Sequence, residues 1–246
     1  MEQAVNLAKR FGNGETACVS ELYEALARLQ GCSKCSRSNV DHLRPYESTR
    51  VQGSREWKQK RQSLVTASEC ASVLGRNPYQ TADKLLMTKC NVVKFSGNKF
   101  TKHGQDMEGI AIHRYEQETG HTVRSFGLLV NPLFPWLGGS PDGITDCGRL
   151  IEVKCPVMRE IILGEVPRMY IDQIQMLLHI TGLEVADFIE MKGAEEFQIV
   201  EVKKDSSWWI DNKENLHTFH QRLTDCKADP TLCPRPKKRK PRFDFG

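Results

Sequence analysis

The sequence predicts an α/β fold in which helices flank a mixed central sheet, and three observations predict it. Helical apolar spacing and strand-like apolar runs succeed one another along the middle of the chain. The 246 residues and the hydrophobic fraction of 39% are sufficient for one globular core with extensions. The order, with helices first, then strands and further helices, is typical of a layered domain.

The chain divides into four predicted regions. Residues 1–31 carry apolar side chains at three- and four-residue intervals, which predicts an N-terminal helical extension. Residues 32–53 are polar and irregular and are expected to form a linker. Periodic apolar patterns then run through 54–228, the expected compact domain. The tail, 229–246, is rich in proline and basic residues and is expected to be disordered.

Within the domain, the first long helix is expected over 101–119, where apolar side chains share one face and Gly120 ends the helix. Strand-like segments follow, interrupted by Gly-Gly and Asp-Gly, and imply an antiparallel meander. A second helix, two strands and a last amphipathic helix complete the order. The expected strands are 126–130, 137–144, 150–155, 185–191 and 197–202, and the later helices are 170–181 and one through Trp209, Leu216, Phe219 and Leu223.

Apolar runs and cysteines limit the class of protein. The apolar runs are far shorter than the roughly 20 residues that span a bilayer. The first residues also lack the order of a signal peptide. We therefore expect a soluble, intracellular protein without a membrane partner.

Nine scattered cysteines fit reduced thiols better than a disulfide framework. Cys32 and Cys35 supply only half of a zinc site, and no second pair lies in this N-terminal region.

The net charge of +4 is concentrated in one place. Most of the excess lies in the basic run between 235 and 242, and the remainder is close to neutral. DNA binding must therefore depend on where charges are placed. The run Pro236–Arg242 is typical of a nuclear localisation signal, which suggests a nuclear location, but it equally fits a non-specific DNA-binding arm.

Two carboxylates and one amine fall on adjacent predicted strands. Because side chains alternate along a strand, Glu152 and Lys154 share a face while Val153 points to the other. Phosphodiester hydrolysis requires neutralised charge and hydroxide at neutral pH, and a carboxylate-held divalent metal supplies both. Asp142 and Glu152, with the Val153 carbonyl as a third ligand, favour Mg²⁺, with Mn²⁺ able to substitute.

A Glu-x-Lys pattern alone more often marks a solvated charged face. Glu152, however, lies in an apolar strand, where unpaired charge is costly and usually functional. Lys154 would lower the pKa of the attacking water or stabilise charge developing on the phosphate, and both roles stay open.

The spacing of these residues resembles a known family. Asp142 followed by Glu152-Val153-Lys154 looks like the PD-(D/E)XK signature, and the surrounding sequence is similar to the YqaJ/lambda exonuclease family. The resemblance spans about 54–202 and implies a restriction-endonuclease-like core. The similar segments are Glu56-Trp57 with Arg61, Thr66-Ala67-Ser68, the helix with Gly104, Glu108 and Ala111, Gly139–Gly143, Glu152–Pro156, and Gln173-Ile174-Gln175.

The resemblance also implies roles for residues outside the core pattern. Glu108 would help arrange the metals, and Gln173 would contact water or phosphate at the edge of the site. Arg61, Ser68 and Ser140 match positions that contribute to a pocket for a 5′-terminal phosphate, and an arginine fork with hydroxyls is a good phosphate receptor.

Several of the residues in these similar segments have a structural alternative. Glu108 would be a helix-surface carboxylate paired with Lys102 or Arg114, and Gln173 an amide on an exposed flank. Ser68 would cap a helix over 68–74. Trp57 is expected to belong to the core rather than to stack on bases.

The leading hypothesis is a metal-dependent DNA exonuclease that acts 5′-to-3′ on double-stranded ends, in recombination or genome processing. An endonuclease of the same fold is the second, because a fold does not fix the substrate. A catalytically silent module that binds DNA or a partner is the third, although the intact Asp142, Glu152 and Lys154 argue against it. The resemblance also implies a single-strand annealing partner and a homotrimer, while residues 1–50 match no family.

Overall fold

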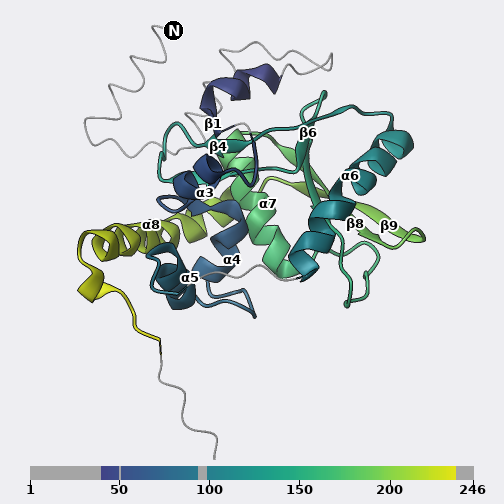
Figure 1. Cartoon of the computed structure of the whole chain (residues 1–246). Coiled ribbons are helices and arrows are strands. Elements are labelled where there is room, and N and C mark those ends of the chain that lie inside the picture. Colours follow the sequence, from purple (N-terminus) through teal and green to yellow (C-terminus); the bar gives the residue numbers. More distant parts are fainter. Residues whose placement is uncertain (1–39, 50, 94–98, 237–246) are drawn as a thin grey trace, which may run out of the picture.

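Two β-sheets form the centre of the computed structural model, which describes residues 40–49, 51–93 and 99–236 (Figure 1). The first has the order β1-β4-β5-β2 and the second the order β3-β6-β7-β8-β9. The strands are β1 (Glu47–Thr49), β2 (Val65–Thr66), β3 (Val123–Arg124), β4 (Leu128–Val130), β5 (Leu137–Gly139), β6 (Gly143–Thr145), β7 (Leu150–Lys154), β8 (Val185–Lys192) and β9 (Glu196–Lys203).

The second sheet lies between two long helices, α6 (Lys99–Thr119) and α7 (Arg168–Thr181). Ile151 and Val153 of β7 belong to one apolar cluster with Ala111 and Tyr115 of α6. Leu150, which precedes Ile151 and points to the other face of the strand, belongs to the larger core with α7. Strand β7 pairs antiparallel with β6 and parallel with β8, so the sheet is mixed. The predicted α/β architecture is therefore confirmed.

Local sequence signals set the ends of the helices. Gly182 ends α7 in the left-handed conformation, with a φ of 74° that glycine adopts without steric cost. The Asp205 carboxylate accepts from the Ser207 N–H at 2.8 Å and caps α8. The remaining helices are η1 (Val40–Tyr46), α3 (Arg55–Arg61), η2 (Ala67–Glu69), α4 (Cys70–Val73), α5 (Ala82–Lys89), α8 (Ser206–Ala228) and η3 (Pro230–Leu232).

The predicted antiparallel meander is wrong at one point. The segment 137–144, with its Gly-Gly and Asp-Gly, was expected to belong to one antiparallel meander, but it forms β5 in one sheet and β6 in the other. Strand β5 already pairs with β4 on one side and with β2 on the other, so neither of its edges is open to β6. The chain therefore crosses between the sheets at residues 140–142.

The folded region extends beyond 54–228 at both ends. Part of the predicted linker 32–53 is ordered, because Val40 and Leu43 are buried in η1 and β1 pairs with β4. Part of the tail predicted as disordered, 229–246, is also ordered, because η3 brings Cys233 into the core with 5% of its surface exposed. The predicted helical extension 1–31 lies outside the described residues.

In the described part of the chain, no helix combines the length and the apolar character that a bilayer span requires.

Candidate active site

Strand β7 presents the central pair of site residues on the face opposite α6. Ile151 and Val153 pack toward α6, so the alternating Glu152 and Lys154 face the other way. There the Nζ of Lys154 contacts the Oε1 of Glu152 and also donates to the Val153 carbonyl at 3.1 Å. The alternation predicted from the sequence is therefore present.

Asp142 lies at the crossover between the two sheets, directly before β6. Its backbone N–H donates to the Ile151 carbonyl at 3.2 Å, and its Oδ2 accepts from the Val153 N–H at 2.7 Å. These two hydrogen bonds fix the Asp142 carboxylate beside the end of β7. The crossover at 140–142, where the predicted meander is wrong, thus positions the Asp142 carboxylate.

Gln173 reaches the Glu152 carboxylate from α7. Its Nε2 donates to the Glu152 Oε1 at 2.5 Å, so this oxygen has two donors, the amide and the Lys154 ammonium. The other oxygen, Oε2, is buried without a hydrogen-bond partner, although Glu152 is 0% exposed. Gln173 is half-buried, which excludes the alternative of an amide on an exposed flank.

Glu108 approaches from α6. Burial raises the pKa of Glu108 to about 7, the Asp142 carboxylate adds to the rise, and Lys154 opposes it. Arg114, one of the two partners expected in the surface alternative, pairs instead with Glu118 at 2.9 Å. The side chain of the other, Lys102, lies outside the described residues.

The electrostatics of the group favour a bound cation. Burial raises the pKa of Glu152 to about 8, opposed by Lys154 and assisted by Asp142, and burial also raises the pKa of Asp142. Burial disfavours the Lys154 ammonium, but Glu152 and Asp142 outweigh this and raise its pKa. When all four groups are ionised, three carboxylates and one ammonium leave an excess of two negative charges, which one divalent cation offsets.

The donor atoms also fit such an ion. The unpartnered Glu152 Oε2, the second oxygen of Asp142 and the Val153 carbonyl are hard oxygen ligands, the type that Mg²⁺ and Mn²⁺ prefer. Glu108 would complete or orient the set. The residues present therefore suit a divalent metal.

A second polar cluster joins α3, η2 and the crossover. The Arg61 guanidinium donates to the Ser68 hydroxyl at 2.8 Å and lies over the Trp57 ring at 4.3 Å. The Trp57 indole N–H donates in turn to the Ser140 hydroxyl at 2.9 Å. Arg61, Ser68 and Ser140, predicted as one group, are thus connected, and Ser140 stands two residues before Asp142.

Two structural alternatives do not hold in this cluster. Ser68 does not cap the helix that follows, because it lies within η2, whose N-cap residue is Thr66. Trp57 is half-buried rather than a core residue. Its role as the link between Arg61 and Ser140 was not predicted, because a sequence does not show which hydroxyl an indole will meet.

Two further contacts were also missed. The ring of Tyr170, in the first turn of α7, lies 5.2 Å from the Lys154 Nζ. Glu69, the residue after Ser68, accepts from the Thr66 N–H at 3.1 Å and pairs with Lys89 at 2.8 Å. A glutamate one residue after Ser68 was the only signal available, and it does not identify the partner.

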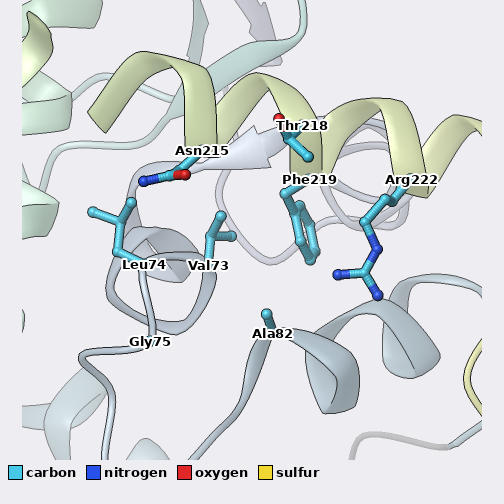
Figure 2. Close-up of a pocket in the computed structure, with 8 residues that line it drawn as sticks. All are labelled: Val73, Leu74, Gly75, Ala82, Asn215, Thr218, Phe219 and Arg222. Atoms are coloured by element: carbon cyan, nitrogen blue, oxygen red, sulfur yellow. The ribbon is translucent and has the colours of Figure 1, made fainter. Parts of the chain in front are cut away.

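A separate pocket lies between α4, α5 and α8 and contains none of these groups. Figure 2 shows Phe219 and Arg222 of α8 facing Val73 and Ala82 across it. Its lining has no carboxylate. This pocket is therefore separate from the group of ionisable residues at the crossover.

Comparison with known proteins places the chain in a family. A family profile described as a YqaJ-like viral recombinase domain matches residues 56–184, which include the candidate site. An uncharacterised protein of Acanthamoeba polyphaga mimivirus is 31% identical over 174 residues, covering 63% of this chain. The match spans only 32% of that viral protein.

Solved structures share the fold. LHK-Exo, an alkaline exonuclease from Laribacter hongkongensis, has a TM-score of 0.62 and 26% identity, over 72% of this chain and 96% of its own. The same enzyme in complex with dAMP matches with the same score over 71% and 95%. A phage-related exonuclease from Haemophilus somnus matches in fold alone, with a TM-score of 0.51, 16% identity, and coverage of 68% and 96%. The chain has a PD-(D/E)XK-like core and belongs to the family of YqaJ-like viral recombinase domains.

Proposed function

We propose that the chain is a metal-dependent deoxyribonuclease that hydrolyses phosphodiester bonds from the ends of double-stranded DNA. The observation that carries the proposal is the fully buried Glu152, whose Oε2 has no partner, in a group with Asp142, Glu108 and a single Lys154. Family membership and the likeness to alkaline exonucleases support the same activity.

Each residue has a role that follows from its contacts. Gln173 and Lys154 hold the Glu152 Oε1 and leave Oε2 free for a cation. The Val153 N–H holds one oxygen of Asp142 and leaves the other free. A bound divalent cation, Mg²⁺ or Mn²⁺, would supply charge neutralisation at the phosphate and make hydroxide accessible near neutral pH. Lys154 would lower the pKa of the attacking water or stabilise charge on the phosphate.

We further propose 5′-to-3′ polarity, with Arg61, Ser68 and Ser140 as the receptor for a 5′-terminal phosphate. The support is their connection through Trp57 to the loop that carries Asp142. A phosphate held there would be anchored beside the reaction centre, which favours removal of terminal nucleotides. LHK-Exo was crystallised with dAMP, a mononucleotide, which suits the same type of reaction.

Digestion of matched DNA substrates tests both proposals. A linear duplex with 5′-phosphates, the same duplex with 5′-hydroxyls and a covalently closed circle would be incubated with Mg²⁺. We expect rapid digestion of the phosphorylated linear DNA alone, and loss of activity in Lys154→Ala by about 10²-fold or more. Lys203→Ala, an exposed lysine on β9, is the matched control and should retain activity. Cutting of the circle would identify an endonuclease instead, and no digestion of any DNA would contradict nuclease activity.

Partners and location are proposals of the same kind. We propose double-stranded DNA as the substrate, a single-strand annealing protein as a partner, and a homo-oligomer, a trimer by resemblance. We also propose nuclear location through Pro236–Arg242. Fusing residues 234–246 to a fluorescent protein should direct it to the nucleus, and a diffuse signal would contradict this.

A further inference from the structure

Three cysteines from separate elements meet where α5, α8 and η3 end. Cys90 is the C-cap residue of α5, Cys226 lies in the last turns of α8, and Cys233 is the C-cap residue of η3. Their sulfur atoms all lie within 4.8 Å of one another, and all three are free thiols. Cys226 and Cys233 are buried and Cys90 is half-buried. None of the three belongs to the candidate active site.

The spacing of the sulfurs is close to that of a tetrahedral zinc site. With a zinc–sulfur distance of about 2.3 Å, two thiolates in tetrahedral geometry lie about 3.8 Å apart. The observed limit of 4.8 Å is therefore within reach of small side-chain adjustments. Thiolates are soft ligands that select Zn²⁺ over the Mg²⁺ that oxygen ligands prefer. A disulfide would use only two of the three sulfurs.

The surroundings also suit a metal. Three thiolates and one Zn²⁺ carry one excess negative charge, and two lysines, Lys89 and Lys227, directly adjoin Cys90 and Cys226 in the sequence. Both lysines line a cavity of about 310 Å³ together with the three cysteines. This cavity has room for a water molecule as the fourth ligand.

We propose that Cys90, Cys226 and Cys233 bind one structural Zn²⁺ that joins α5, α8 and the segment after α8. The ion would hold in place two lysines that support α3. Lys89 donates to the carbonyls of Arg61 at 2.7 Å and Leu64 at 2.9 Å, and Lys227 donates to that of Gln62 at 2.8 Å. Zinc would thereby stabilise the turn that follows α3, the helix that ends at Arg61.

Metal analysis of the purified full-length chain tests the proposal. Protein from zinc-supplemented cells should contain about one zinc per chain by elemental mass spectrometry, as expected for a single structural site. Cys226→Ser and Cys233→Ser should lose it. Cobalt substituted into the wild-type chain should show thiolate-to-metal charge-transfer absorption. Zinc-free wild-type protein that takes up no zinc when reduced would overturn the proposal.

Matched variants locate the metal. Cys147→Ser alters another cluster of potential ligands, His121, Asp146 and Cys147, and should retain the zinc. The double variant Cys32→Ser/Cys35→Ser should retain it as well. Zinc that disappears only in these control variants would place the ion elsewhere and contradict the proposal.

Alkylation of the wild-type chain gives a readout that does not depend on whether the variants fold. With zinc bound, Cys90, Cys226 and Cys233 should be alkylated slowly, and a chelator should accelerate all three, as followed by peptide mass spectrometry. Equal rates with and without chelator, or a disulfide among the three cysteines in protein purified under reducing conditions, would contradict a zinc site.

Discussion

Glu152 is the residue on which the candidate site depends. One of its oxygens has two donors and the other has none, although the side chain is fully buried. A buried, unpartnered anionic oxygen is costly, and a proton or a cation removes that cost. The metal-free chain is therefore expected to take up a proton at this site, and the loaded chain to exchange it for the ion.

This exchange predicts how the stability of the metal-free chain depends on pH. Burial raises the pKa of Glu152 from 4.5 to about 8, so the folded state binds more protons than the unfolded state between these values. The free energy of unfolding should then fall as pH rises from about 5 to 8, by at most about 1.4 kcal/mol per pH unit for this one group. Urea denaturation in metal-free buffer at several pH values measures the slope.

Glu152→Gln is the matched variant for this measurement, because the amide has nearly the same shape and does not titrate. The fall in stability should be smaller in the variant, leaving the part that Glu108 and Asp142 contribute, because burial raises the pKa of both. Added Mg²⁺ should also reduce the fall in the wild-type chain. A stability that rises over this range in the metal-free protein would contradict the assigned direction.

At the scale of elements, β5 is held by close packing under α7. A Cβ added at Gly139 would lie 2.6 Å from a Leu177 methyl carbon and 3.1 Å from the Ala67 Cβ. The approach of α7 to the crossover therefore depends on the missing side chain. The close packing of Leu177 on Gly139 also helps to hold α7 where Gln173 can donate to Glu152.

Gly139→Ala should accordingly destabilise the chain, by about 1–3 kcal/mol, because the added methyl group overpacks the core. Gly109→Ala is the matched control, since no atom lies within 4 Å of a Cβ added there. Because Gly109 lies in α6, its replacement should stabilise the chain slightly, by up to about 1 kcal/mol. Urea denaturation would compare the two variants. Equal effects would show that α7 can move away from residue 139 without a loss of stability.

The turn after α3 depends on one buried lysine, Lys89. Lys89 is 4% exposed, pairs with Glu69 at 2.8 Å, and serves two backbone carbonyls. Lys89→Met leaves Glu69 and both carbonyls without this partner and should cost about 3–5 kcal/mol in stability. Lys84→Met changes an exposed lysine on the same helix and should cost little. A similar loss in both variants would remove the special role of Lys89.

The sequence predicts these elements better than it predicts their pairing. Helical periodicity located α6, α7 and α8, and strand alternation placed Glu152 and Lys154 on one face. The crossover at 140–142 was missed, because pairing depends on which strand edges are already occupied. The order in 40–49 was missed for a related reason, since β1 is too short to show a period and is stabilised by β4.

The site shows the same limit: the sequence predicts its residues but not the contacts between distant segments. Spacing and family resemblance identified the charged residues, because these chemistries recur at fixed positions in a strand. The links between them come from packing of distant segments, as with Trp57 and Ser140, which are 83 residues apart in sequence. Such contacts leave no local pattern, so the proposed phosphate receptor was predicted as a set of residues without the Trp57 indole that connects them.

For the whole molecule, charge of opposite sign is concentrated in two separate regions of the chain. The candidate site carries an excess of carboxylates, while the basic run contains five Lys and Arg residues in 237–242. Since the rest of the chain is nearly neutral, this run is the largest local source of attraction for a phosphate backbone.

Truncation after Pro236 should therefore weaken DNA binding in a salt-dependent way. Each phosphate neutralised by Lys or Arg contributes about 0.9 to the slope of log affinity against log salt, so losing five charges should reduce the slope by at most about 4.5. Fluorescence anisotropy with Ca²⁺ in place of Mg²⁺ would measure binding with cleavage suppressed. A variant with Arg239→Lys and Arg242→Lys keeps the charge and should keep the slope. An unchanged slope after truncation would show that the run contributes nothing to DNA binding and would leave nuclear import as its function.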